Sequence, residues 1–143
     1  MKPQPDRDSD LEWLRDFHGR RYWLECGWSI RIRAVSVAVT ESRPFGIRYA
    51  LTLHDEGGGR LLGFDNAHGI SRETVFDHQH PYRRTGALKP YGFLSAAELI
   101  KDFFEAVEMA CKLEGKEFSF NDELFELDLA DDEEVPDGTQ IIE

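Results

Sequence analysis

Three histidines and two aspartates lie within 16 residues near the middle of the chain: Asp65, His68, Asp77, His78 and His80. Imidazole titrates near neutral pH, so it can both accept and release protons. In an extended segment His78 and His80 point to the same side, because strand side chains alternate. Such a pair suits cleavage of an RNA phosphodiester, in which one histidine takes the proton of the ribose 2′-hydroxyl and the other protonates the departing 5′-oxygen.

Cleavage of this kind also needs positive charge near the phosphate oxygens. Arg72, Arg83 and Arg84 lie close in the sequence and are candidate substrate-binding residues. Tyr82 is a candidate to stack on a base, although an aromatic residue at such a place also commonly anchors a loop. Asp77 can instead hold one imidazole in a single tautomer, which leaves one active histidine.

The same cluster allows a metal site and a purely structural role. A His-x-His pair with nearby carboxylates can bind a divalent transition metal, and His68 or Asp65 can complete the set. The spacing matches no well-known zinc motif, so we expect no metal and no other cofactor. Asp65-Asn66 at a strand end is also ordinary turn chemistry. The number of these residues in one long segment favours a function for the cluster as a whole.

Alternation of apolar and polar residues predicts the strands that precede the cluster. The glycines at 57–59 predict a hairpin turn, and strands joined by short turns favour an antiparallel meander. Residues 66–92 lose this periodicity, and a loop of that length inside a compact domain is commonly functional. The predicted strands are residues 21–26, 28–33, 47–53 and 60–65.

One long helix is expected after the cluster. Residues 95–98 (Ser-Ala-Ala-Glu) form a capping box, and apolar residues follow at helical spacing until a stop near Gly115. A short helix over residues 11–17, with Asp10 as its N-cap, is also indicated. We therefore expect an α+β fold, in which an antiparallel sheet of about four strands is packed against one long amphipathic helix.

Charge is unevenly distributed along the 143 residues, whose net charge is −11. Residues 1–101 carry 15 basic and 13 acidic residues, whereas residues 102–143 carry two basic and 15 acidic ones. We expect one domain over residues 1–116, with residues 1–10 frayed, and an acidic C-terminal extension over residues 117–143. The extension either aids solubility or lies on the basic part of the protein and competes with RNA.

The sequence contains no apolar run close to the roughly 20 residues that span a bilayer. The N-terminus lacks the apolar core of a signal peptide. Cys26 and Cys111 lie far apart, and we interpret them as two reduced thiols. These features predict a cytoplasmic protein that does not associate with a membrane.

The order of the motifs resembles the TumE family of bacterial toxin–antitoxin systems over roughly residues 20–112. The resemblance implies a small cytoplasmic toxin that cleaves RNA and is neutralised by an antitoxin, usually a helix-turn-helix protein. The acidic extension of 27 residues departs from typical members, which end soon after the helix. The shared series is Arg48-Tyr49-Ala50-Leu51-Thr52-Leu53, Phe64-Asp65-Asn66-Ala67-His68-Gly69, Asp77-His78-Gln79-His80, Pro90-Tyr91-Gly92-Phe93 and Asp102-Phe103.

Carried over by position, five residues match the family's motif: Asp65, Asn66, Asp77, His78 and His80. The sequence therefore predicts a metal-independent ribonuclease in which His78 and His80 act as acid and base. Asp77 is expected to orient an imidazole, and Arg83 or Arg84 to stabilise the phosphate. Two other functions stay open, namely a non-catalytic protein-binding module and a metal-dependent hydrolase that uses the Asp/His cluster.

Overall fold

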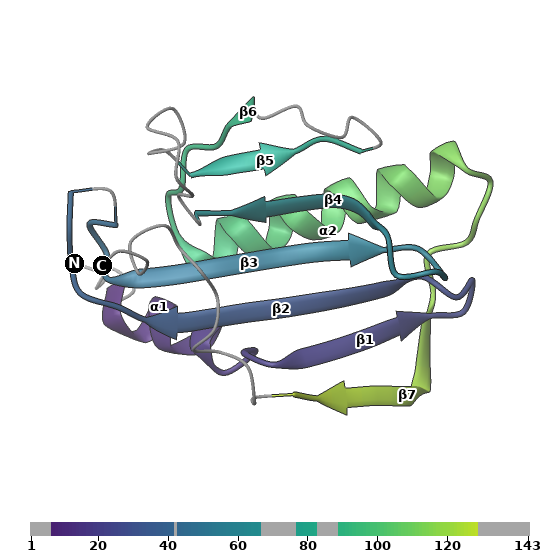
Figure 1. The fold of residues 1–143 in the computed structure, drawn as a ribbon, viewed down its shortest axis with the longest axis horizontal. Coiled ribbons are helices and arrows are strands. Elements are labelled where there is room, and N and C mark those ends of the chain that lie inside the picture. Colours follow the sequence, from purple (N-terminus) through teal and green to yellow (C-terminus); the bar gives the residue numbers. More distant parts are fainter. Residues whose placement is uncertain (1–6, 42, 67–76, 83–88, 129–143) are drawn as a thin grey trace, which may run out of the picture.

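The computed structural model of the chain describes residues 7–41, 43–66, 77–82 and 89–128, and only the backbone of Arg7 and His78. These residues form one antiparallel sheet of seven strands and two helices (Figure 1). The helices are α1 (Arg7–Arg15) and α2 (Ala96–Leu113). The strands are β1 (Arg20–Leu24), β2 (Ser29–Ser36), β3 (Ile47–His54), β4 (Arg60–Asp65), β5 (His78–His80), β6 (Lys89–Pro90) and β7 (Phe120–Leu127). Their order across the sheet is β6-β5-β4-β3-β2-β1-β7.

The predicted α+β class is confirmed, but the sheet has more strands than the expected four. The expected long helix is α2, and the short helix indicated over residues 11–17 corresponds to α1, which begins earlier. β1 to β4 form the predicted meander. Among the described residues, the additional strands are β5 and β6, from the segment predicted as a loop, and β7, from the acidic extension. β5 and β6 span three and two residues, which is too short for any alternation to be visible in the sequence.

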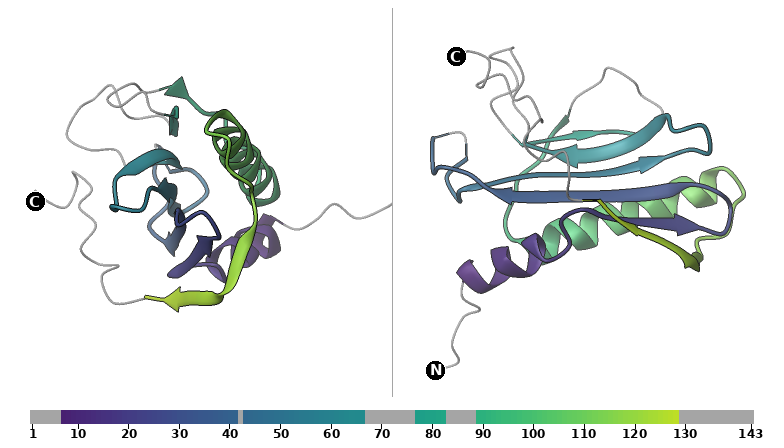
Figure 2. Two further views of the ribbon diagram at one scale, coloured as in Figure 1. Left: turned by 90° about the vertical axis from the view of Figure 1, so that its right-hand side faces the viewer. Right: turned by 60° about the horizontal axis from the view of Figure 1, so that its bottom comes forward.

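Both helices lie on the same side of the sheet (Figure 2). Every second residue of β3 is buried beneath them, and the intervening positions are less buried. The other side of the sheet, which we call the open face, is covered by no helix or strand that the structure describes. The main contributors to the core are Ile30, Ile32, Ile47, Tyr49, Leu51, Leu53, Leu99, Phe103 and Val107.

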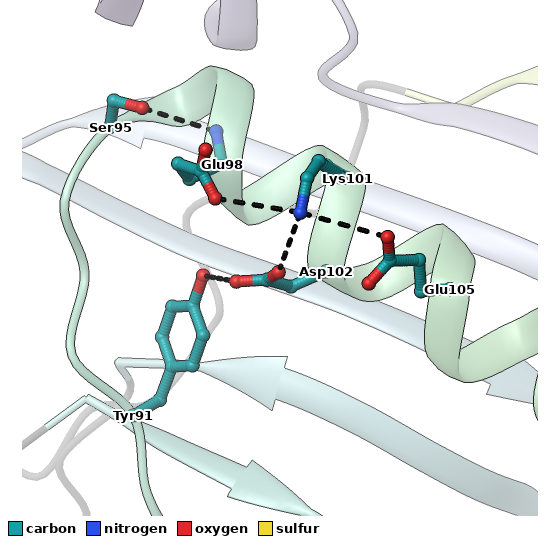
Figure 3. Close-up of polar contacts among 6 residues, drawn as sticks. All are labelled: Tyr91, Ser95, Glu98, Lys101, Asp102 and Glu105. Atoms are coloured by element: carbon teal, nitrogen blue, oxygen red, sulfur yellow. Dashed lines mark hydrogen bonds and ion pairs between the residues drawn. The ribbon is translucent and has the colours of Figure 1, made fainter.

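Both ends of α2 agree with the sequence prediction. The Ser95 hydroxyl accepts a hydrogen bond from the Glu98 amide at 3.1 Å, which caps the first turn (Figure 3). At the other end Gly115 has a φ of +69°, and the Lys116 amide donates to the Cys111 carbonyl at 2.8 Å. This is a Schellman ending, in which glycine takes the left-handed conformation.

The expected role of Asp10 as N-cap of its own helix is wrong. α1 begins at Arg7, so residues 7–10 are helical rather than frayed and Asp10 lies inside the helix. Its carboxylate accepts hydrogen bonds from the amides of Ala96 at 2.6 Å and Ala97 at 3.2 Å. Asp10 therefore caps α2 from α1, where a carboxylate also interacts favourably with the helix dipole.

None of the described helices is long and apolar enough to cross a membrane. The two cysteines are free thiols, and Cys111 is buried in α2. Burial raises the pKa of the Cys111 thiol to about 11, so the thiol stays protonated and packs as a small apolar group.

Candidate active site on the open face

His80 and Asp65 form the centre of the described site. β4 and β5 pair so that Asp65 lies opposite the backbone of His78, and Gly63 lies opposite His80. Nε2 of His80 is 3.1 Å from Oδ2 of Asp65, and the two side chains are only 16% and 10% exposed. The contact is a diagonal cross-strand pair on the open face, at the end of β4.

A second contact identifies the tautomer of His80. Its Nδ1 lies 3.3 Å from Nη2 of Arg60. A guanidinium group only donates hydrogen bonds, so we assign Nδ1 as the acceptor and Nε2–H as the donor to Asp65. In this tautomer the lone pair of Nδ1 is directed toward Arg60. A carboxylate in this position orients the ring and stabilises the positive charge that develops when the ring accepts a proton.

The carboxylate that contacts His80 is that of Asp65, not the one predicted to orient an imidazole. Oδ2 of Asp77 instead accepts a hydrogen bond from the Tyr49 hydroxyl at 2.8 Å. Asp77 and His80 are three positions apart in an extended segment, so their side chains leave on opposite faces. Burial and the adjacent Asp77 carboxylate raise the pKa of Tyr49 well above its ordinary value, so the phenol remains a donor.

Asn66 fixes the backbone beside the pair. Its Oδ1 accepts from the Tyr49 amide and its Nδ2 donates to the Ile47 carbonyl, both at 2.9 Å. Its own carbonyl accepts from Nη2 of Arg43 at 2.9 Å. The side chain is buried and uses both ends of its amide. Asn66 therefore holds the end of β4 against the start of β3.

Tyr91, Phe93 and Asp102, which follow the histidines in the motif series, lie on the side of the sheet that carries the helices. The Tyr91 hydroxyl donates to Oδ2 of Asp102 at 2.6 Å, which ties the segment before α2 to the helix (Figure 3). Burial and this carboxylate raise the pKa of Tyr91 above its ordinary value. The ring centroid of Phe93 lies 5.5 Å from that of Tyr49. Motifs that are far apart in sequence thus meet at one end of the sheet.

The open face is rich in arginine, because arginines fill the polar positions of the strands. In the part of β1 to β5 that the structure describes, Asp65 is the only carboxylate that shares this face with them. The row of opposed positions that contains His80 is Arg21, Arg31, Thr52, Gly63 and His80. The next row is Arg33, Ala50, Asp65 and the backbone of His78. We call Arg21, Arg31, Arg33, Arg48 and Arg60 the arginine face.

The arginine face is not among the cations predicted from the sequence, all of which are close to the histidines along the chain. The sequence nevertheless indicates this face, because Arg31 and Arg33 occupy the polar positions of a strand in which apolar and polar residues alternate. The predicted cations Arg72, Arg83 and Arg84 lie outside the described residues, as do His68 and the side chain of His78.

Tyr82, predicted to bind substrate, contacts the other end of α2. Its hydroxyl donates to Oε2 of Glu114 at 2.7 Å, and its ring centroid lies 6.4 Å from that of the buried Trp28. These contacts match the alternative that an aromatic residue here anchors the loop to the core.

His54 provides a second imidazole on the open face, with different partners. Its Nε2 lies 2.9 Å from the Thr52 hydroxyl and its Nδ1 lies 3.2 Å from the Gly58 carbonyl. Burial, and to a smaller extent the positive charges of Arg21 and nearby arginines, lower the pKa of His54. The hydrogen bond to the Gly58 carbonyl acts in the opposite direction but does not outweigh burial, so His54 is mainly neutral at pH 7.

Within the described residues, no group of three or more His, Cys, Asp or Glu side chains is arranged to hold a metal ion.

Comparison with models of protein families assigns the chain to a family. A family model described as Toxin TumE matches residues 20–110, which is more than half of the chain. The matched range includes the Asp65–His80 pair and the network around Asn66, Asp77 and Tyr91. Comparisons with curated proteins and with solved structures gave no significant match.

Proposed function

Because the chain belongs to the TumE toxin family, we propose that it is the toxin of a bacterial toxin–antitoxin pair and that it acts by cleaving RNA. Its partner is a cognate antitoxin with a helix-turn-helix. The catalytic part of the proposal rests on one observation, the contact of His80 with Asp65 on the arginine face. It combines a group that exchanges protons with a surface that attracts phosphate.

In the proposed reaction, Nδ1 of His80 accepts the proton of a ribose 2′-hydroxyl. The 2′-oxygen then attacks the adjacent phosphorus, which forms a 2′,3′-cyclic phosphate and breaks the bond to the 5′-oxygen. Asp65 stabilises the imidazolium ion that forms, because it already accepts the Nε2 proton. Arg60 moves from Nδ1 to the phosphate oxygens, since a doubly charged transition state attracts a guanidinium group more strongly than a neutral imidazole does.

His78 is the proposed acid that protonates the leaving 5′-oxygen. Its backbone lies opposite Asp65 in the β4–β5 register and two residues from His80. Positions 78 and 80 are two residues apart in β5, and this spacing is the reason for proposing His78 as the acid.

The proposal is tested by cleavage of single-stranded RNA with purified protein. The variant His80→Gln should lower the rate by about 100-fold or more, as expected for loss of a general base. Asp65→Asn keeps the shape of the side chain but removes its charge, and should lower the rate by about tenfold or more. His54→Gln is the matched control, since it removes an imidazole from the same face, and should cleave like the wild type.

The same assay separates the rival functions. Full cleavage by the double variant His78→Gln, His80→Gln would show that the acid–base mechanism is wrong. Growth inhibition by that variant, together with no RNA cleavage by any form, would favour a protein-binding module. Loss of cleavage in EDTA and its return with a divalent metal would favour a metal-dependent hydrolase. Circular dichroism of each variant confirms that the fold is intact.

A further inference from the structure

An open pocket of about 300 Å³ lies beside the candidate site, on the side of the sheet that carries the helices. It is formed at the start of β3, the end of β4 and the residue before β5, where Tyr49, Asn66 and Asp77 line its wall. This volume is at the lower end of the range of small-molecule sites, which is roughly 300–1,000 Å³. Neither the proposed cleavage mechanism nor the core accounts for it.

Aromatic rings form much of the pocket wall. Phe45, Tyr49, Tyr91 and Phe93 all line it. The Phe93 centroid lies 5.4 Å from that of Phe45 and 5.5 Å from that of Tyr49, and the planes of Phe93 and Tyr49 are tilted by only 30°. Walls of this kind favour a flat aromatic ligand, and splayed-out RNA bases are commonly held by such stacking.

The polar part of the wall presents hydrogen-bond acceptors. Asp77 accepts from the Tyr49 hydroxyl, which fixes its orientation, and an ionised carboxylate has about four lone-pair sites in total. Glu41 adds a second carboxylate to the lining. The amide of Asn66 and the guanidinium of Arg43 instead bond to backbone, which stiffens this wall.

Only one of the four RNA bases offers two adjacent N–H donors on its Watson–Crick edge. Guanine presents N1–H and the N2 amino group side by side, which matches the two oxygens of a carboxylate. Adenine and cytosine each place an acceptor next to their amino group, and uracil places its one donor between two acceptors. We propose that this pocket binds a guanine base of the RNA substrate, with N1–H and N2–H donating to Asp77.

The location of the pocket suits this role, which builds on the proposed cleavage of RNA. Asn66 in the pocket wall directly follows Asp65 of the catalytic pair, and Asp77 precedes the strand that carries His80. Neighbouring Cα atoms are only about 3.8 Å apart. The pocket and the pair of His80 and Asp65 lie on opposite faces of the sheet at the same end of β4, so an RNA chain whose base lies in the pocket reaches the pair around this end of the sheet.

The test is calorimetric titration of the full chain with GMP, IMP and AMP, which cannot be cleaved. GMP should bind about tenfold more tightly than IMP, which lacks the N2 amino group, and AMP should bind no better than IMP. Asp77→Asn should weaken GMP binding by about tenfold or more and abolish the preference over IMP. Asparagine still accepts from Tyr49, so the wall keeps its structure. Glu108→Gln, an exposed acid on α2, is the matched control and should bind GMP like the wild type.

Two further variants keep the outcomes distinct. Phe93→Leu removes an aromatic wall without touching Asp77, and should weaken all three nucleotides alike. His80→Gln should leave the preference for GMP over IMP unchanged, because His80 does not line the pocket and the two nucleotides carry the same phosphate. No binding of GMP to the wild type, or equal binding of GMP and IMP, would overturn the guanine site even if RNA is cleaved. Specific GMP binding without any RNA cleavage would instead show that the proposed catalytic function is wrong and that the guanine site is right.

Discussion

Asp65 and Asn66 are consecutive residues of one motif, yet their side chains have different partners. Asp65 contacts the imidazole of His80, whereas Asn66 bonds to the backbone of Ile47 and Tyr49. A matching motif therefore does not imply matching roles. The Asn66 side chain, predicted as part of the catalytic set, is 3% exposed and occupied by backbone groups, which favours a structural contribution.

Substitution of Asn66 should therefore lower stability before it affects chemistry. Asn66→Ala leaves the Tyr49 amide and the Ile47 carbonyl without these partners, and should reduce the free energy of unfolding by about 2 kcal/mol. Asn66→Asp should be at least as harmful, because a carboxylate cannot donate to the Ile47 carbonyl. Urea unfolding measures both effects, and Asp65→Asn provides the comparison, with a large loss of cleavage but a smaller loss of stability. A wild-type midpoint for Asn66→Ala would show that this interpretation is wrong.

The contact between His80 and Asp65 illustrates what a single sequence can predict about such a site. The cluster itself, and the common face of positions 78 and 80, follow from residue type and strand periodicity. The sequence does not show that His80 contacts Asp65 rather than Asp77, because this depends on the register in which β5 pairs with β4. That register is a property of the folded sheet, and Asp77 is the nearer residue only along the chain.

At the level of elements, the strands with clear alternation were the predictable ones. β2 and β3 bury alternate residues against the helices, so their apolar periodicity marks them. β5 and β6 have little apolar content, because they are short strands at one edge of the sheet. β7 is largely exposed and its apolar residues alternate only partly. It pairs with β1, which is far away along the chain, and the residues around either strand do not indicate this pairing.

The contact of Asp10 with α2 is another long-range feature, and it predicts a measurable effect. Asp10→Ala removes the acceptor for the amides of Ala96 and Ala97 and should lower the free energy of unfolding by about 1 kcal/mol. Asp8→Ala removes an exposed acid from the same helix and is the control, with an expected change of less than about 0.5 kcal/mol. Thermal or urea unfolding gives both values. Equal effects of the two substitutions would contradict a capping role for Asp10.

For the molecule as a whole, the important feature is how the two signs of charge are arranged. The arginine face spans β1 to β4, and the acidic strand β7 lies at its edge. Glu126 lies opposite Arg21 in the β1–β7 register, and Oδ2 of Asp128 is 3.6 Å from Nη2 of Arg31. The acidic end of the chain therefore begins in contact with the surface proposed to bind RNA. Residues 129–143, which lie outside the described residues, add six acids and no base.

This arrangement predicts that the acidic end competes with RNA for the arginine face. Removal of residues 129–143 from the His80→Gln variant, which should bind RNA without cleaving it, is expected to raise RNA affinity by about threefold to tenfold at low salt. The gain should shrink between about 50 mM and 200 mM salt, because the competition is between charges. This deletion is preferable to removal of residues 117–143, which also eliminates β7 and its pairing with β1.

A chain of full length in which the six acids after Asp128 are changed to amides separates charge from bulk. Competition by charge predicts that this variant binds RNA as tightly as the truncated one at low salt. If only the truncated chain gains affinity, the tail acts by occupying space. If neither gains affinity, the tail does not compete with RNA, and the contact of Asp128 with Arg31 serves only to hold the end of β7. The salt dependence discriminates further, because a steric block would give the same gain at every ionic strength.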